Sequence, residues 1–198
     1  MGINMENDIT YPSFKKITSK LINLKGKLIN LSYSNGQIYE IDSSQNIYYC
    51  NDYFKGFWFK VSASLEQISF DGYKNIVIGI NSKGQIFYTF NTIYINPHKK
   101  NLPWNLLPNP NNIFFKWISL SNNKAFVTDR DDNVYYSYTY NSGNWIKINN
   151  IKLSKVSFDG FNNIVFGVYN NKIFYATTNM NNPIFNEISG PPLNNINY

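Results

Sequence analysis

The chain has 198 residues and a mass of 23.1 kDa, which suits one compact domain or two very small ones. Hydrophobic residues make up 43% of it, 18% of the residues are aromatic and only three are alanine, so the composition supports a buried core and excludes an all-helical fold. The net charge is +6, but because Arg130 is the only arginine, sequence-specific nucleic-acid binding is not expected.

The N-terminal residues 1–8 lack the apolar core of a signal peptide. No later stretch approaches the roughly 18 apolar residues that span a membrane. These patterns predict a soluble protein with no signal peptide and no transmembrane segment. They leave two locations open, the cytoplasm and export without a leader, with a virion component as one form of the latter.

The rest of the chain is expected to form short strands, and the clearest set covers residues 58–90. Two strands, 58–61 and 65–70, are followed by an Asp71-Gly72 turn, a buried strand 76–80, a hairpin turn 81–84 and a fourth strand 85–90. Four short strands joined by tight turns form one antiparallel sheet. Such a sheet cannot bury both of its faces alone, so we expect several to stack around an axis.

An internal duplication underlies this pattern. Residues 69–79 recur at 157–167 with eight of eleven positions identical, and Trp58 and Trp145 both begin a Trp-x-Lys-aliphatic segment. The repeated motif ends in Gly79 and Gly167. Glycine weakens an isolated strand. We therefore expect that at both positions the backbone passes close to a neighbouring segment, near the axis around which the sheets stack. The duplicated unit is 87 to 88 residues long.

Each unit is itself double, because an aromatic residue opens a new segment every 40 to 46 residues. That period is typical of propeller blades with four strands. We predict a single all-β domain, 14–198, built as a small β-propeller with four blades, with five as the alternative. The expected parts are an N-terminal extension 1–13, modules 14–57, 58–103, 104–144 and 145–184, and a closing strand 185–188. The closing strand is predicted to pair with the N-terminal module; in a five-bladed ring, residues 14–28 would take part.

The segment 58–88 resembles the tectonin β-propeller repeat: Trp-x-x-aliphatic, Leu-x-x-Ile-Ser, a Gly turn, an inner strand ending in Gly-aliphatic-Asn, and a Gly-x-Ile-Phe-Tyr hairpin. Residues 145–175 resemble it nearly as well, whereas the modules at Phe14 and Trp104 lack the inner glycine. The resemblance implies a non-enzymatic binding module. Tectonin propellers include lectins for lipopolysaccharide or O-methylated sugars and scaffolds in membrane trafficking. The resemblance therefore implies a lectin-like, carbohydrate-binding protein with a glycan or glycoconjugate partner. The alternative that it implies is a protein-interaction or structural scaffold.

Catalytic and metal chemistry have little support in the sequence. His98 is the only histidine and Cys50 the only cysteine, so no catalytic triad, His/Cys metal site or intramolecular disulfide is expected. Cys50 is interpreted as a strand residue. The loop 129–133 has the acidic spacing of a calcium loop but lacks its central glycine, and we interpret it as a hairpin turn. No cofactor and no catalytic residue are predicted.

Six residues are candidate ligand contacts, and each has a structural alternative. A recurring tryptophan can stack on a sugar or act as a wedge between sheets, and a recurring Asp-Gly can bind a sugar or form a turn. Trp117 lies outside the recurring series and aligns with the polar Asn30, which favours an exposed aromatic there. The candidates are Trp58, Trp104, Trp117, Trp145, Asp71 and Asp159. The oligomeric state, and whether the ring closes within one chain, are left open.

Overall fold

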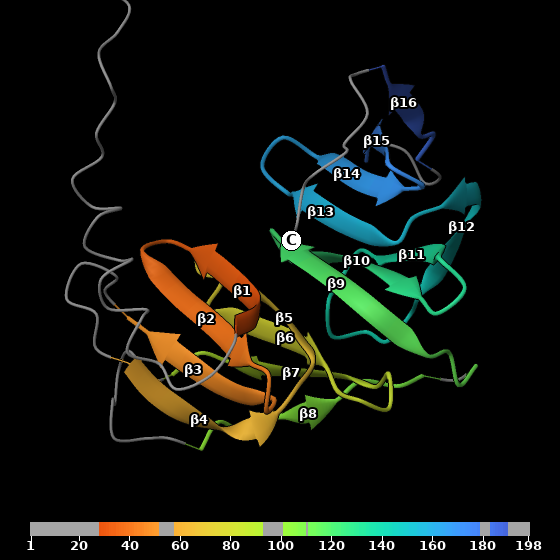
Figure 1. Ribbon diagram of the computed structural model, residues 1–198. Coiled ribbons are helices and arrows are strands. Elements are labelled where there is room, and N and C mark those ends of the chain that lie inside the picture. Colours follow the sequence, from red (N-terminus) through yellow and green to blue (C-terminus); the bar gives the residue numbers. More distant parts are fainter. Residues whose placement is uncertain (1–27, 52–57, 93–100, 110, 179–182, 190–198) are drawn as a thin grey trace, which may run out of the picture.

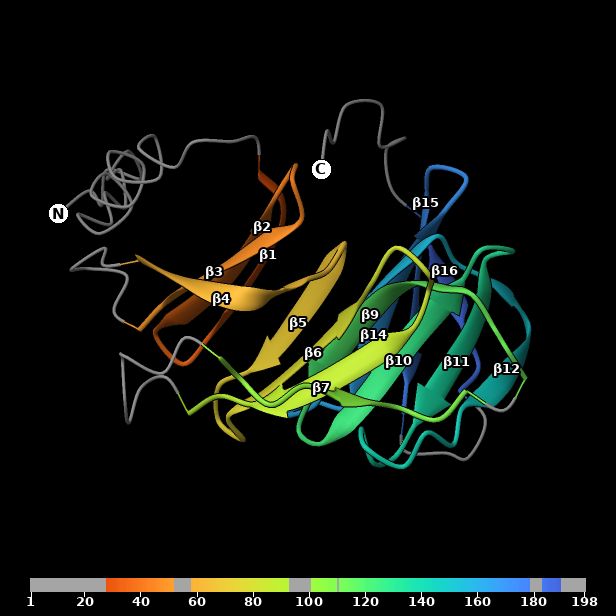
Figure 2. The ribbon, with the colours of Figure 1, turned by 90° about the horizontal axis from the view of Figure 1, so that it is seen from below.

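The computed structural model describes residues 28–51, 58–92, 101–109, 111–178 and 183–189, and within these ranges it contains sixteen strands and no helix (Figure 1). The strands form four antiparallel four-stranded sheets, arranged as the blades of a small β-propeller. In Figure 2 the sheet within residues 28–64 lies on the left, the sheet within 115–152 on the right, and strands of the sheet within 67–106 between them. The prediction of an all-β, four-bladed propeller is confirmed.

Each blade uses four consecutive strands, paired in chain order. Blade 1 consists of β1 (Leu28–Ser34), β2 (Gln37–Asp42), β3 (Asn46–Cys50) and β4 (Trp58–Ser64). Blade 2 consists of β5 (Gln67–Asp71), β6 (Ile76–Ile80), β7 (Ile86–Phe90) and β8 (Asn105–Leu106). Blade 3 consists of β9 (Phe115–Ser121), β10 (Lys124–Asp129), β11 (Asn133–Ser137) and β12 (Ile146–Lys152). Blade 4 consists of β13 (Lys155–Asp159), β14 (Ile164–Tyr169), β15 (Lys172–Thr177) and β16 (Asn186–Ile188).

The blades are offset by one strand from the predicted modules. Trp58 opens β4, the outermost strand of blade 1, rather than the first strand of a new sheet. In the same way β16 pairs with β15 of its own blade, so the prediction that 185–188 pairs with the N-terminal module is wrong. The physical reason is that this segment completes the fourth blade as its outer strand. Phe14 and the rest of residues 1–27 lie outside the described residues.

Asparagine forms many of the tight turns between these strands. Among the described residues, eleven other than glycine have a positive φ, and nine of these are asparagine. Asn122 and Asn123 connect β9 to β10, and Asn170 and Asn171 connect β14 to β15, with all four φ angles between 47° and 69°. Two consecutive positive φ angles give the hairpin turn whose twist matches that of the strands, and asparagine tolerates this conformation better than most residues.

The core consists of three apolar clusters, one between each pair of consecutive blades. The two repeated glycines lie at such contacts. A Cβ atom on Gly79 or Gly167 would come within 2.4 Å of the Cδ1 atom of Leu65 or Leu153. The expected close approach is therefore present at both positions. However, the neighbour is the leucine that precedes β5 or β13, not the propeller axis.

Side chains of the inner strands also tie consecutive blades together. A serine hydroxyl on one inner strand accepts a hydrogen bond from a backbone N–H of the next. Ser32 Oγ accepts from Phe70 N at 2.8 Å. Ser69 Oγ accepts from Leu120 N and Ser119 Oγ from Phe158 N, both at 2.9 Å. The sequence motif that repeats a serine in each inner strand therefore encodes the contact between blades.

Ser69→Ala is expected to lower the free energy of unfolding by about 1–2 kcal/mol, because it leaves the buried N–H of Leu120 without an acceptor. Ser121→Ala is the matched control, since no described residue forms a hydrogen bond with that hydroxyl, and it is expected to change stability by less than about 0.5 kcal/mol. Urea unfolding of both variants measures the difference. Equal effects would contradict the role of Ser69 in the contact between blades.

Candidate binding site

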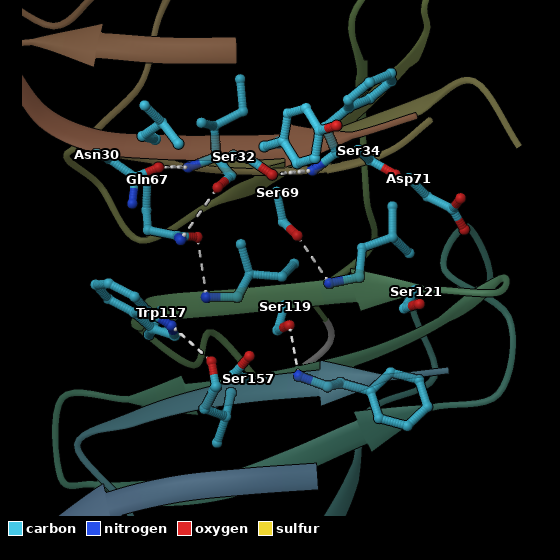
Figure 3. Close-up of a pocket in the computed structure, with 18 of the residues that line it drawn as sticks. Asn30, Ser32, Ser34, Gln67, Ser69, Asp71, Trp117, Ser119, Ser121 and Ser157 are labelled. Carbon is cyan, nitrogen blue, oxygen red and sulfur yellow. Dashed lines mark hydrogen bonds between the residues drawn. The ribbon is translucent and has the colours of Figure 1, made fainter. Parts of the chain in front are cut away.

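A cavity of about 340 Å³ lies at the centre of the propeller, bounded by the inner strands β1, β5, β9 and β13 (Figure 3). Side chains alternate along a strand, so every second residue of each inner strand points toward this centre. These residues are mostly polar. They are Asn30, Ser32 and Ser34 from β1, Gln67, Ser69 and Asp71 from β5, Trp117, Ser119 and Ser121 from β9, and Ser157 from β13.

Part of this polar lining is already used to hold the blades together. Asn30 Oδ1 accepts a hydrogen bond from Ile68 N, and Gln67 Oε1 accepts from Ile118 N, both at 3.0 Å. Three of the serines that line the cavity are different. In the part of the chain that the structure describes, the hydroxyls of Ser34, Ser121 and Ser157 have no hydrogen-bond partner. These three groups are therefore available to a ligand.

Trp117 holds the position of Asn30, as the sequence alignment predicted, and also that of Gln67. It is half-buried and packs on the cluster between blades 3 and 4, so the expected exposed aromatic is not found. Its Nε1 donates a hydrogen bond to the carbonyl of Val156 at 2.9 Å, and Lys155 Nζ lies 4.7 Å from the centre of its ring. Trp117 lines the central cavity. Its indole N–H, however, is already used in the contact between blades 3 and 4.

The other three candidate tryptophans lie away from the central cavity, at the outer strands. Trp58 is half-buried at the start of β4, opposite Cys50. Trp104 packs on the cluster between blades 1 and 2, and Trp145 on the cluster between blades 2 and 3. The ring centres of Trp145 and Phe115 lie 5.5 Å apart. The packing of Trp104 and Trp145 therefore matches the alternative of a wedge between sheets.

Asp71 and Asp159 each organise a turn at one end of the inner strands. Asp71 Oδ1 accepts hydrogen bonds from the backbone N–H groups of Tyr73 at 3.1 Å and Lys74 at 3.2 Å. Asp159 Oδ1 accepts from the N–H of Phe161 at 3.0 Å. Its Oδ2 accepts from the Asn162 side chain at 2.7 Å, and this bond lowers the pKa of Asp159. Of the two, Asp71 also lines the cavity.

These turns bring two exposed aromatic rings together beside the cavity. Tyr73 is 63% exposed and Phe161 66% exposed, and both line the cavity. Although blades 2 and 4 are not neighbours, the two ring centres lie 5.1 Å apart in an edge-to-face contact. Neither residue is among the candidates predicted from the sequence. The signal was present, because both aromatics follow Asp-Gly in the duplicated motif 69–79 and 157–167.

The hairpins of blades 1 and 3 support these turns from the side. Asn35 Nδ2 donates to the carbonyl of Gly72 at 3.4 Å, and Asn122 Nδ2 donates to the carbonyl of Gly160 at 3.2 Å. The duplicated two-blade unit thus builds each half of the cavity mouth in the same way, with an asparagine hairpin of one blade fixing the aromatic turn of the next.

The remaining sequence candidates have structural roles or lie outside the described residues. Asp129 Oδ1 accepts from the N–H groups of Asp131 and Asn133, and its Oδ2 accepts from the Tyr135 hydroxyl, which confirms the hairpin-turn interpretation. Cys50 is a fully buried strand residue. His98 lies outside the described ranges. Within those ranges no cluster of three or more His, Cys, Asp or Glu side chains could hold a metal ion.

Residues 1–191 match the family model of the tectonin domain. The chain belongs to the tectonin family. As a tectonin propeller it has the fold of a binding module, as the resemblance implied. In the described part of this tectonin domain, no helix has the length and apolar character needed to cross a membrane.

A search of the curated proteins finds no match to this tectonin domain. Solved structures do match it. The computationally designed Ika4 protein is 13% identical, with a TM-score of 0.53 over 77% of this chain and 93% of Ika4. Prp20p from Saccharomyces cerevisiae is 11% identical, with a TM-score of 0.56 over 84% of this chain and 51% of Prp20p. Human WBSCR16 is 9% identical, with a TM-score of 0.59 over 85% of this chain and 55% of WBSCR16. These likenesses show the fold, and the tectonin domain spans about half the length of the last two proteins.

Proposed function

We propose that this tectonin domain binds carbohydrate at the mouth of its central cavity. The observation that carries the proposal is the exposed pair Tyr73 and Phe161 beside a cavity lined with hydroxyl groups. A sugar ring has an apolar C–H face, which packs on an aromatic ring, and a polar edge of hydroxyls, which needs hydrogen-bond partners. The mouth presents both kinds of surface within one small site.

The polar half of the site is supplied by the ends of the inner strands. Each serine hydroxyl can donate one hydrogen bond and accept two, and Ser34, Ser121 and Ser157 form none with other described residues. Asp71 also lines the cavity, but its Oδ2 is buried, without a hydrogen-bond partner within the described chain. A cavity of about 340 Å³ is at the lower end of the size range of ligand pockets, which suits one or two sugar units.

The mouth has the groups for binding rather than for turnover. Hydrolysis of a glycosidic bond generally needs two carboxyl groups on either side of that bond, one of them with a raised pKa. Here Asp159 has a lowered pKa because Asn162 donates to it, and Asp71 Oδ1 is used by its turn. A non-enzymatic lectin is the function that the geometry supports best.

A glycan array with the purified chain is the first experiment, followed by titration of the best glycan. Tyr73→Ala and Phe161→Ala are each expected to weaken binding about tenfold, because each removes one stacking surface. Phe90→Ala is the control, since Phe90 is also exposed but lies on the outer part of blade 2. An array without any bound glycan, or a Tyr73→Ala variant that binds as well as the wild type, would contradict the proposal.

A protein-binding scaffold is the second candidate. Prp20p, which shares the fold, is described as binding Gsp1p and histones. In this chain the supporting observation is a row of exposed apolar side chains on one face of β1: Ile29, Leu31 and Tyr33. An empty glycan array together with a captured protein partner would favour this candidate.

A further inference from the structure

Three of the junctions between blades are closed and follow one pattern. In each inner strand, the residues that alternate with the cavity-lining side chains pack on the preceding blade. They are Ile68 and Phe70 in blade 2, Ile118 and Leu120 in blade 3, and Val156 and Phe158 in blade 4, and none is more than 6% exposed. Inner strands of consecutive blades are also in contact, β1 with β5, β5 with β9 and β9 with β13.

Blade 1 presents the same face without a blade against its inner strand. Leu31 and Tyr33 hold the positions of Ile68 and Phe70, but they are 49% and 57% exposed. Within the described ranges, β1 and β13 do not form the contact that joins the other inner strands. Of the four junctions that a closed ring of these blades would need, the one between blades 4 and 1 is open.

Blade 4 presents the complementary face, and no described blade packs against it. Phe166 pairs with Ser157 across the blade, as Tyr39 pairs with Ser32 in blade 1, Ile78 with Ser69 in blade 2 and Phe126 with Ser119 in blade 3. Those three residues are at most 2% exposed, whereas Phe166 is 42% exposed. Phe166 therefore lies where the core of the next junction would form.

The hydrogen bonds between blades also differ at the open junction. In blades 1, 2 and 3 the central serine accepts from the N–H of the next inner strand. Ser157 is the equivalent serine of blade 4, and its hydroxyl is exposed and forms no hydrogen bond within the described chain.

We propose that the open junction binds a second copy of this chain, with the Leu31 face of each copy on the Phe166 face of the other. The two faces are complementary because the repeat has already paired their equivalents three times in this molecule. A twofold axis makes both junctions identical and leaves neither face exposed, so the assembly closes as a ring of eight blades.

The test is the mass of the purified full-length chain in solution, measured by size exclusion with light scattering from about 1 to about 100 µM. The wild type is expected to show twice its 23.1 kDa mass. Leu31→Lys and Phe166→Glu each place an unpaired charge in both junctions of a dimer, so each is expected to weaken association by at least roughly 100-fold and give the monomer. Both positions are exposed in the single chain, and circular dichroism melting checks that each variant folds.

Mixing the two variants is the decisive step. A mixed pair contains one junction with both native residues and one in which Lys faces Glu, so the mixture is expected to regain the dimer mass. Leu106→Lys is the matched control, because Leu106 is 55% exposed on the outer strand β8, and it is expected to stay dimeric. A monomeric wild type, a dimer unaffected by Leu31→Lys, or a mixture that stays monomeric would overturn the proposal.

Discussion

The free energy of unfolding is expected to fall by about 3 kcal/mol as the pH rises from 4.5 to 7. The cause is Glu40 on β2, which has no exposed surface and whose two carboxylate oxygens have no hydrogen-bond partner in the described chain. Burial, with a smaller contribution from the charge of Asp42, raises the pKa of Glu40 from 4.5 to about 7. The folded protein therefore binds this proton more tightly than the unfolded chain does. The resulting stability is fully present below pH 4.5 and is lost as the pH passes 7.

Urea unfolding across pH 4.5 to 8 measures this slope, and Glu40→Gln is expected to remove it, because the amide stays neutral throughout. The variant should therefore be more stable than the wild type above pH 7. Glu66→Gln is the control, since Glu66 is an exposed glutamate of the same blade junction, and it should keep the wild-type slope. If Glu40→Gln keeps that slope as well, Glu40 is not its source.

Gly72→Ala is expected to destabilise the protein by about 2–3 kcal/mol. A Cβ atom on Gly72 would lie 2.6 Å from the carbonyl oxygen of Ser34 and 2.8 Å from its carbonyl carbon. Both are backbone atoms of blade 1, so the contact can be relieved only by moving the turn or the neighbouring blade. Because the same turn carries Tyr73, the substitution is also expected to weaken any ligand bound at the cavity mouth.

Thermal unfolding of Gly72→Ala measures this cost, and Gly160→Ala should behave alike, since its Cβ would meet the carbonyl oxygen of Ser121 at 2.7 Å. Gly36→Asn serves as the control. Gly36 has a φ of +75° and no atom within 4 Å of its Cβ position, and asparagine accepts that backbone conformation, so a change of less than about 0.5 kcal/mol is expected. A Gly72→Ala variant that unfolds like the wild type would show that the two turns do not pack as described.

The substitutions that test the open junction and the cavity mouth change different residues, although Ser157 contributes to both and Leu31 also lines the cavity. The proposed glycan contacts are Tyr73 and Phe161 on the turns after β5 and β13, whereas the proposed dimer contacts are Leu31 on β1 and Phe166 on β14. Leu31→Lys can therefore give a monomer while glycan binding at each mouth persists. Loss of one property without the other in these variants would separate the two proposals.

The sequence by itself determined the all-β class, the duplication and the number of blades. These properties are local or repeat along the chain. A short continuous apolar run specifies a buried strand such as 76–80, and asparagine and glycine pairs specify the turns between strands. The recurrence of the motif 69–79 at 157–167 is visible without any knowledge of contacts.

Only the tertiary structure decided which blade each strand joins and which surfaces stay exposed. The strand that begins at Trp58 can pair with the strand before it or the strand after it, and the alternation of its residues is the same in both cases. Leu31 and Ile68 likewise follow the same pattern in sequence, yet one is 49% exposed and the other 1%. The difference arises because a blade covers Ile68 and none covers Leu31, which depends on how far the ring closes in space. The pairing of Tyr73 with Phe161 has the same origin, since it joins two turns that lie 88 residues apart in the chain.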